Sequence, residues 1–420
     1  MDTRALGEWL VGAAGQAAVA GATAGLDAGR PELTVATALR REGLDPERAA
    51  LTLDAASTRR RARATFPDAE QLLLTREALE QASDPLVSAW RAARIAQVLA
   101  PGGVVLDLCA GAGGDTLALA AAGLSVRAVE RDPLRAALLA HNARTRNLDV
   151  EVVLADLDDV EVPRGAIVHV DPSRRRDGRR VRRLRDHEPE VPRVLARVRP
   201  AAAGIALTLS PAVDLDDPDL PADAEVGFVQ RHGELHETTV WLGVLRATTG
   251  AGTSSSRVPA RASATLLPEG LSRLRAERAP RLAVGPIGAH LIEVAPAAVR
   301  ARLHDELGAQ VGARRVATRR ALLSVDTAPP PSPWYRSRAV QAVLPARPPV
   351  VRRWLRAVET CPVELVLHGF EADLDAWWRA LGRPPRGPDG RRIELIRTDD
   401  GAFAVVTDAG RGTMVPWMTR

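Results

Sequence analysis

The stretch that decides the fold is Val104-Val105-Leu106-Asp107-Leu108-Cys109-Ala110-Gly111-Ala112-Gly113-Gly114-Asp115-Thr116. Its first five residues form an apolar run broken only by Asp107, which is typical of a buried parallel strand. A loop of small residues follows, and helical spacing of apolar residues resumes at Leu117. This order predicts a site for a nucleotide-like ligand, because a Cβ at Gly111 or Gly113 would block the ligand's approach to the backbone. Asp107 is expected at the strand end, where open α/β sheets bind ligands.

Three further apolar runs follow, and each of them ends in a carboxylate. The runs and their acids are 125–129 with Glu130, 150–154 with Asp156, and 166–170 with Asp171. Parallel strands carry their ligands at their carboxyl ends, so all these acids are expected at one edge of the sheet. A carboxylate at the end of the second strand is placed to accept hydrogen bonds from ribose hydroxyls.

These residues resemble the class I S-adenosylmethionine-dependent methyltransferases. The first loop fits their Asp-x-Gly-x-Gly-x-Gly pattern, with Cys109 in place of the first glycine, and the resemblance is specific over 100–172. It implies S-adenosylmethionine as cofactor, with its ribose at Glu130 and its adenine at Asp156. The cofactor-binding residues that it implies are Asp107, Cys109, Gly111, Gly113, Glu130 and Asp156.

The motif after the fourth strand is Asp171-Pro172-Ser173-Arg174-Arg175. It falls where many nucleic-acid methyltransferases carry Asp/Asn-Pro-Pro-aromatic beside the transferred methyl, so Asp171, Pro172 and Ser173 are the implied catalytic residues. A strand-end carboxylate can hold the N–H groups of a base. A carbon acceptor would need a cysteine nucleophile there, and none lies near Asp171, so a nitrogen acceptor is favoured. Related proteins often carry a lysine where this chain has Thr208, so no lysine-assisted step is expected.

The Asp-Pro-Ser-Arg-Arg motif, the segment 79–83 and the C-terminal third are similar to one bacterial branch, whose members carry a THUMP-like C-terminal domain. This similarity implies RNA capture by that domain. Within 79–83, Gln81 either reaches the cofactor pocket or is a capping or buried polar residue. Trp377 and Trp378 fit the core of the C-terminal module better than a base-stacking platform.

An arginine-rich run leaves directly from the fourth strand end, and eight of the twelve positions over 174–185 are arginine. The run is either a solvated, mobile loop or a phosphate-binding segment, and its place beside the expected methyl donor favours the second. The expected substrate-binding residues are Arg174, Arg175, Arg179, Arg180, Arg182 and Arg183. A second arginine cluster, 59–63, fits a solvated helix face better than an RNA-facing one.

The predicted fold is α/β: a doubly wound, mostly parallel seven-stranded methyltransferase sheet, with an N-terminal helical domain and a small C-terminal α/β (THUMP-like) domain. Its last three strands are expected at 204–209, 224–229 and 239–245. The expected domains are 1–84, helical; 85–247, methyltransferase; 248–259, a linker; 260–335, an intermediate α+β region; and 336–420, THUMP-like.

Composition indicates which partners and which compartment the protein is expected to have. The chain has 420 residues, 46% of them hydrophobic, and its 57 basic residues are all arginine, with a net charge of +5 that permits a polyanionic partner. Two distant cysteines argue for a reduced compartment and against a disulfide.

No apolar run approaches the roughly 20 residues of a membrane span, so a cytoplasmic location is expected. His232, His236 and Glu237 are expected in one turn without further ligands, so no metal is expected.

The leading hypothesis is therefore an RNA methyltransferase acting on a base nitrogen of tRNA or rRNA. A non-catalytic RNA-binding protein that retains the fold stays open, as does a small-molecule methyltransferase. An NAD-dependent oxidoreductase would require Gly-x-Gly-x-x-Gly, which the loop at 109–114 does not match. The sequence does not define the oligomeric state.

Overall fold

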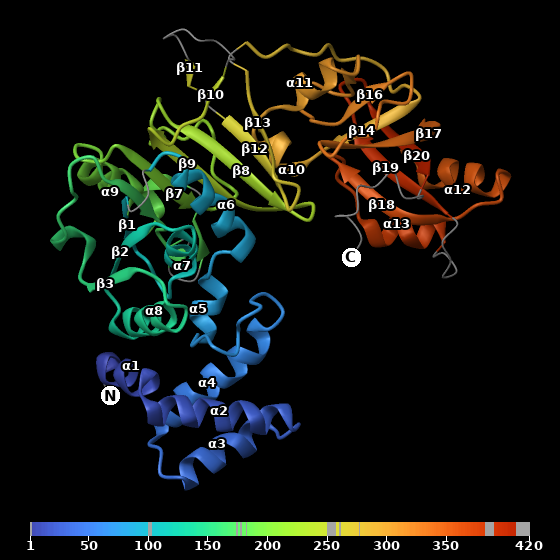
Figure 1. Cartoon of the computed structure of the whole chain (residues 1–420). Coiled ribbons are helices and arrows are strands. Elements are labelled where there is room, and N and C mark those ends of the chain that lie inside the picture. The colour runs from blue at the N-terminus through green and yellow to red at the C-terminus, as the bar shows by residue number, and fades with distance from the viewer. Residues whose placement is uncertain are drawn as a thin grey trace. The chain divides into compact units, whose positions relative to one another are not determined.

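The computed structural model describes residues 2–99, 103–173, 175–176, 179–181, 183–249, 258–259, 262–276, 278–382 and 390–408. Of the short pieces 175–176, 179–180, 248–249 and 258–259 it describes the backbone alone. The chain forms two compact units (Figure 1). The first comprises Met1–Val226 and Glu237–Ala247, and the second comprises Gly227–His236 and Thr248–Arg420.

The chain begins with six helices that precede the first strand. They are α1 (Thr3–Val11), α2 (Ala13–Asp27), α3 (Glu32–Arg41), α4 (Pro46–Ala62), α5 (Arg76–Gln81) and α6 (Pro85–Ala96). Asp45 and Asp84 cap α4 and α6, each followed by a proline at the first helical position. Leu10 and Leu26 share a buried cluster with Leu138 of the methyltransferase region, so these helices pack onto it.

No single helix in the described part of the chain is long and apolar enough to cross a membrane. Only α1 and α2 pass that test of length and composition together, and the pair is bent by 73°.

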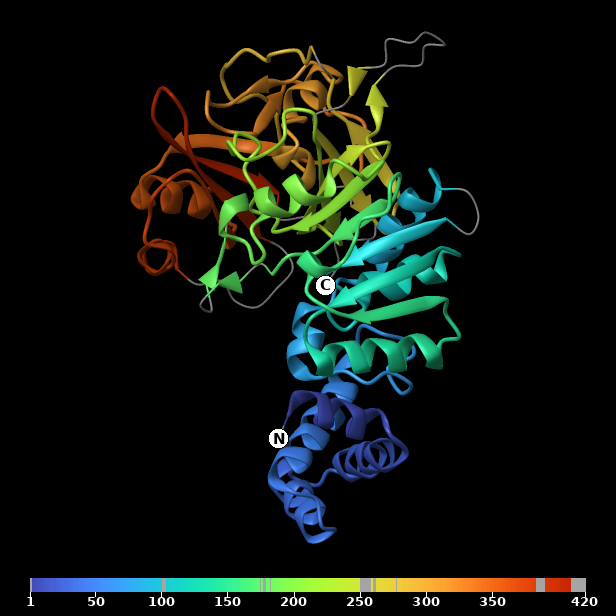
Figure 2. The same cartoon turned by 90° about the vertical axis from the view of Figure 1, so that its left-hand side faces the viewer.

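The first five predicted strands are present at the expected places. They are β1 (Val104–Leu108), β2 (Ser125–Glu130), β3 (Val150–Leu154), β4 (Ile167–Val170) and β7 (Gly204–Leu209). The pairs β1–β2, β2–β3, β1–β4 and β4–β7 are parallel, and in Figure 2 the arrows of β1, β2 and β3 end at one edge. A strand's apolar run decides its position locally, which is why the sequence places these strands well.

The remaining strands make the sheet larger than predicted. They are β8 (Glu225–Arg231), β9 (Glu234–Gly243), β12 (Ala262–Leu267) and β13 (Leu271–Leu274). The order is β13-β12-β8-β9-β7-β4-β1-β2-β3, so the sheet has nine strands rather than seven. The predicted seven are contiguous in that order, with β9 antiparallel to β7. The correction arises because β12, expected in the intermediate region, pairs with β8.

Helices cover this sheet with apolar side chains. They are α7 (Gly114–Ala121), α8 (Pro133–Thr145) and α9 (Val191–Val198), together with α6. One buried cluster joins Ile95 of α6 and Leu119 of α7 to Val105, Ile167 and Trp241 on three strands. The start of α7, which follows the glycine loop, is therefore fixed by core packing.

The arginine-rich run has regular backbone where it is described. Its strands β5 (Arg175–Arg176) and β6 (Arg179–Arg180) pair antiparallel as a short hairpin. An isolated bridge between Ser173 and Glu188 closes the base of the segment. The described part of this run therefore forms a short hairpin.

The second unit contains a seven-stranded sheet in the order β15-β16-β14-β17-β20-β19-β18. Its elements are β14 (His290–Val294), α10 (Pro296–Arg300), α11 (His304–Ala309), β15 (Arg314–Arg315), β16 (Leu323–Val325), β17 (Tyr335–Pro345), α12 (Pro348–Ala357), β18 (Pro362–His368), α13 (Leu374–Leu381), β19 (Arg391–Arg397) and β20 (Ala402–Asp408). The expected boundary between 335 and 336 falls inside this sheet, because β17 pairs with both β14 and β20. Trp377 lies in the core with Leu355 and Leu395, which confirms its core reading.

Candidate active site

The carboxyl ends of β1 to β4 bring the predicted acids to one edge of the sheet. The register places Leu108 beside both Val129 and Val170, and Glu130 beside Leu154. The backbone N–H of Asp171 donates to the Leu108 carbonyl at 3.4 Å. Asp171 therefore follows β4 directly beside the loop that leaves β1.

The small-residue loop is held open by left-handed backbone at three positions. The φ angles are 61° at Cys109, 59° at Gly111 and 95° at Gly113. A Cβ added at Gly111 would meet no atom within 4 Å, whereas one added at Gly113 would overlap Leu139 Cδ1. Only Gly111 therefore borders open space, and the prediction that both glycines serve ligand approach needs this correction: Gly113 serves internal packing.

Cys109 takes a backbone conformation that favours glycine, consistent with its place in the motif. Burial raises the pKa of its thiol well above the ordinary range, and the nearby acids Glu130, Asp171 and Asp107 raise it further. A thiol with a raised pKa stays protonated and is a poor nucleophile. Cys109 therefore fits a loop position rather than a reactive one.

Glu130 braces this loop. Its carboxylate is 5% exposed and accepts the backbone N–H of Gly111 and of Asp132, each at 2.8 Å. A carboxylate offers about four acceptor positions, so capacity for two hydroxyls of a ribose is left. Asp156, after β3, accepts the N–H of Asp158 at 3.1 Å and caps the short 3₁₀ helix η1 (Leu157–Asp159).

Asp107 is buried and bonded to protein groups. It accepts the hydroxyl of Thr116 and lies 2.7 Å from Nδ1 of His169. The other ring nitrogen of His169, Nε2, lies 3.0 Å from the Thr208 hydroxyl. Asp107 thus ties the end of β1 to α7 through Thr116 and to β4 through His169.

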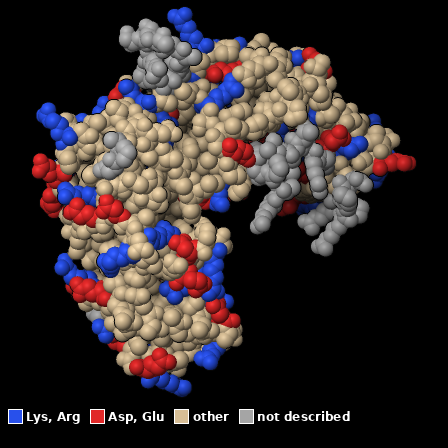
Figure 3. All heavy atoms as spheres, in the orientation of Figure 1, with Lys and Arg blue, Asp and Glu red and all other residues tan. Residues whose placement is uncertain are grey.

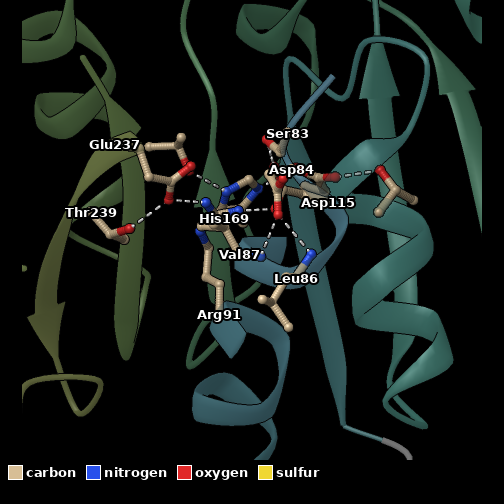
Figure 4. Close-up of polar contacts among 12 residues, drawn as sticks. Ser83, Asp84, Leu86, Val87, Arg91, Asp115, His169, Glu237 and Thr239 are labelled. Atoms are coloured by element: carbon tan, nitrogen blue, oxygen red, sulfur yellow. Dashed lines mark hydrogen bonds and ion pairs between the residues drawn. The ribbon is translucent and has the colours of Figure 1, made fainter. Parts of the chain in front are cut away.

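A second buried polar group lies on the same side of the sheet. Arg91 of α6 donates to Asp115 in the first turn of α7 and to Glu237 of β9, as Figure 4 shows. Ser83 donates to Asp115 at 2.7 Å, and Thr239 donates to Glu237 at 3.1 Å. One buried cation therefore holds two buried carboxylates, as such groups require.

Several of these residues were missed by the sequence reasoning. His169 reads as one member of an apolar strand, and Arg91 as one residue of an amphipathic helix. His236 and Glu237 lie on β9 rather than in the turn, where only His232 remains, because β9 begins at Glu234. Within the described part of the chain, no three His, Cys, Asp or Glu residues are grouped as metal ligands are. The signal that could have found His169 was its position two residues before the carboxylate of Asp171.

The segment 79–83 reaches the site through a different residue than expected. Gln81 is exposed and donates to Glu77 at 3.2 Å, whereas Ser83 is buried against Asp115. Gly114 permits this approach, because a Cβ there would lie 3.2 Å from the Ser83 nitrogen.

Of the expected catalytic residues, Pro172 is buried and Ser173 is exposed, with its N–H donating to the Glu188 carbonyl at 2.8 Å. Of the expected substrate-binding arginines, Arg174 and Arg182 lie outside the described residues. Arg175, Arg179 and Arg180 are described by their backbone alone, and Arg183 is exposed.

Three of the four arginines in the other cluster pair with acids of the protein. Arg60 and Arg63 pair with Asp27, Arg63 also with Glu70, and Arg61 with Glu80. Figure 3 shows acidic and basic side chains side by side over the N-terminal helices. This pairing favours the solvated-face reading of 59–63.

Comparison with known proteins gives consistent results. A family model for RNA cap guanine-N2 methyltransferases matches residues 102–181. An uncharacterised S-adenosylmethionine-dependent methyltransferase, found in two strains of Mycobacterium tuberculosis, is 30% identical over 340 residues, covering 80% of this chain and 88% of the relative.

A solved structure of a candidate methyltransferase from Porphyromonas gingivalis W83 has a TM-score of 0.69 at 20% identity, covering 87% of this chain and 92% of that one. This likeness supports the fold, and the sequence relatives support the chemistry, which sets aside the oxidoreductase alternative. The chain belongs to the S-adenosylmethionine-dependent methyltransferase family, and S-adenosylmethionine is its methyl donor.

Proposed function

We propose that the protein methylates a nitrogen atom of a base in tRNA or rRNA. The observation that carries the proposal is the place of Asp171-Pro172, which follows β4 beside the glycine loop and leads straight into the arginine hairpin. The matching family model, whose name specifies a guanine nitrogen of RNA, spans the segment from this loop to Val181. It supports both the nucleic acid and the nitrogen acceptor.

The donor site fits S-adenosylmethionine. Open space at Gly111 lets the ligand approach the backbone, and Glu130 keeps acceptor positions for ribose hydroxyls. The proposal assigns the adenine edge to Asp156, and it assigns Asp107 and Cys109 to the strand end and loop beside the donor. When bound, S-adenosylmethionine supplies an electrophilic methyl group. Holding donor and acceptor in line can lower the barrier by roughly 7–11 kcal/mol.

Asp171 positions the acceptor in this proposal. Its carboxylate accepts the N–H of the target base, so that the nitrogen lone pair points toward the donor side of the crevice. Pro172 restricts the backbone that carries this carboxylate. Ser173, exposed beside it, lines the approach to the base.

The arginines hold the RNA backbone. Arginine binds phosphate through a planar fork of donors, and such contacts position a nucleic acid without reading its sequence. We place these contacts at Arg174, Arg175, Arg179, Arg180, Arg182 and Arg183. The THUMP-like domain expected at 336–420 would capture a more distant part of the RNA, with the exposed Arg352, Arg353 and Arg356 of α12 as contacts. The proposed location is cytoplasmic.

Methylation of total RNA tests the proposal. Purified protein and labelled S-adenosylmethionine are incubated with RNA from a strain that lacks the gene, and the nucleosides are then identified. Label in one N-methylated nucleoside is the expected result. Label only in small molecules would favour the small-molecule alternative. Donor affinity without transfer to any RNA would favour a non-catalytic binding protein, and either result would contradict the proposal.

RNA docking is tested by filter binding over a salt series. Changing Arg179, Arg180, Arg182 and Arg183 together to glutamine should flatten the log–log salt dependence by about 0.7 for each lost contact with single-stranded RNA. A second variant changes Arg352, Arg353 and Arg356 of α12, to which the proposal assigns more distant RNA contacts. An unchanged slope in the first variant and a flatter one in the second would move the docking surface to α12.

A further inference from the structure

His169 connects β4, which leads to Asp171, with β1, which leads into the donor loop. It lies on β4, two residues before Asp171, and is fully buried. Its Nδ1 lies 2.7 Å from Asp107 at the end of β1, and its Nε2 lies 3.0 Å from the Thr208 hydroxyl on β7. An ionised carboxylate only accepts hydrogen bonds, so Nδ1 donates to Asp107.

The backbone pairing of β4 with β1 and β7 ends at Val170, one residue before Asp171. β4 has four residues, and the hydrogen bond from the Asp171 N–H to the Leu108 carbonyl is 3.4 Å long. Ordinary N–H···O bonds are about 2.7–3.2 Å long, so this one contributes little. The hydrogen bond from His169 to Asp107 lies two residues before Asp171 on β4, because the strand register places His169 directly beside Asp107. It adds a side-chain tie between β4 and β1, close to Asp171, to the backbone pairing of the two strands.

The order Asp107, His169, Thr208 is also that of a hydrolytic triad, with threonine as nucleophile. The burial of Thr208 argues against that role. Its side chain lies within β7 and the residue is 0% exposed, so no acyl group can reach its hydroxyl. The three residues therefore act on the protein itself.

We propose that His169 is a positioning residue for methyl transfer: through Asp107 and Thr208 it fixes the end of β4, and with it Asp171, against the donor loop. The inference rests on the proposed acceptor role of Asp171. Misplacing that carboxylate slows transfer, because catalysis by proximity depends on the alignment of donor and acceptor. Donor affinity should change much less than kcat, because Glu130, Gly111 and Asp156 lie on other elements and keep their own hydrogen bonds.

Four variants separate these contributions. His169→Phe removes both ring hydrogen bonds, and His169→Asn keeps an N–H near the position of Nδ1. Thr208→Val removes one hydroxyl at nearly constant shape. Thr23→Val is the matched control, because it removes a buried hydroxyl that donates to the Val19 carbonyl within α2 and leaves both bonds of His169 intact.

His169→Phe should lower kcat by about 100-fold, the scale of a misplacement of about 1 Å. S-adenosylhomocysteine affinity should stay within a few-fold of that of the wild-type protein. His169→Asn should recover much of kcat, and Thr23→Val should keep it. Equal losses of kcat and donor affinity in His169→Phe, or no rescue by His169→Asn, would overturn the proposal.

Hydrogen–deuterium exchange tests the same idea without any RNA. Amides over 170–173 should exchange faster in His169→Phe and Thr208→Val, while those over 110–114 stay unchanged. Unchanged exchange over 170–173 would overturn the inference even if RNA methylation is established. Faster exchange there, in a protein that fails to methylate RNA, would uphold the restraint on β4 and reject the proposed substrate. Thr208→Val serves where His169→Phe does not fold.

Discussion

The carboxylate of Glu130, at the end of β2, accepts the backbone N–H of Gly111 at 2.8 Å. The acid expected to hold the donor's ribose thus also braces the loop that the donor approaches. Its second oxygen accepts the N–H of Asp132, at the start of α8. One side chain therefore links the ends of β1 and β2.

Glu130→Gln should weaken S-adenosylhomocysteine binding by about 1–3 kcal/mol, because charge-assisted hydrogen bonds to ribose and to backbone N–H groups are lost. Calorimetric titration measures the change. Glu151→Gln is the control, since Glu151 forms an exposed pair with Arg127 on the same sheet. Equal affinity in both variants would remove Glu130 from the donor site.

Alanine at the two loop glycines should affect different properties: fold stability at Gly113 and mainly donor binding at Gly111. Gly113→Ala should destabilise the fold by about 1–3 kcal/mol through overlap with Leu139, beyond its backbone strain. Gly111→Ala should cost only about 1–2 kcal/mol of left-handed strain but weaken donor binding. Urea unfolding and calorimetry separate the two effects. If Leu139→Ala fails to relieve Gly113→Ala, the overlap is not the cause.

Asp171→Ala should leave donor affinity nearly unchanged and remove most turnover, because the residue is proposed to hold the acceptor. Initial rates with the methylated RNA, together with S-adenosylhomocysteine titration, give the two quantities. Turnover within a few-fold of that of the wild-type protein would reject the acceptor-positioning role.

Arg91→Met should destabilise the protein by about 3–5 kcal/mol, because Asp115 and Glu237 then stay buried without their cation. Adding Asp115→Asn and Glu237→Gln should recover much of this loss, since the triple variant buries no unpaired charge. Denaturant unfolding of the variants measures it. A triple variant as unstable as Arg91→Met would contradict the charge-based explanation.

Asp68 gives the fold a pH dependence at low pH. Hydrogen bonds from Arg146 lower the pKa of its carboxyl group below the ordinary range. The pair therefore stabilises the folded chain above the unfolded pKa of about 3.9, and this contribution is lost as the pH falls through the lower folded value. The difference in unfolding midpoint between wild type and Asp68→Asn should be largest near neutral pH and should shrink in acid. A constant difference would contradict this assignment.

The sequence predicts what local patterns determine. The first five strands and the glycine loop were predictable because each apolar run and its terminal residue lie within a few positions. His169 was not, because its partners Asp107 and Thr208 lie 62 and 39 residues away in the chain. Arg91 and Glu237 are 146 residues apart, and only the folded sheet brings them together.

Pairing with distant segments explains the other differences. The short run at 262–267 carries no sign that it will extend the methyltransferase sheet beside β8. The prolines at 329–333 suggest a break between modules, yet strands from both sides join one sheet. The four arginines over 59–63 look alike in sequence. The acidic partners of three of them come from α2, from α5 and from Glu70.

The division of the chain into two units limits how recombination can divide the gene. The chain crosses between the units three times, at 226/227, 236/237 and 247/248. A gene cut after Ala247 would keep β8 but remove β12, and the exposed strand edge would favour aggregation. The second unit also cannot be moved as a single piece without part of the first, because residues 237–247 of the first unit lie between its two segments. No single cut yields two whole units: one at 226/227 divides the first unit, one at 247/248 divides the second, and one at 236/237 divides both. The two units are therefore expected to be gained and lost together.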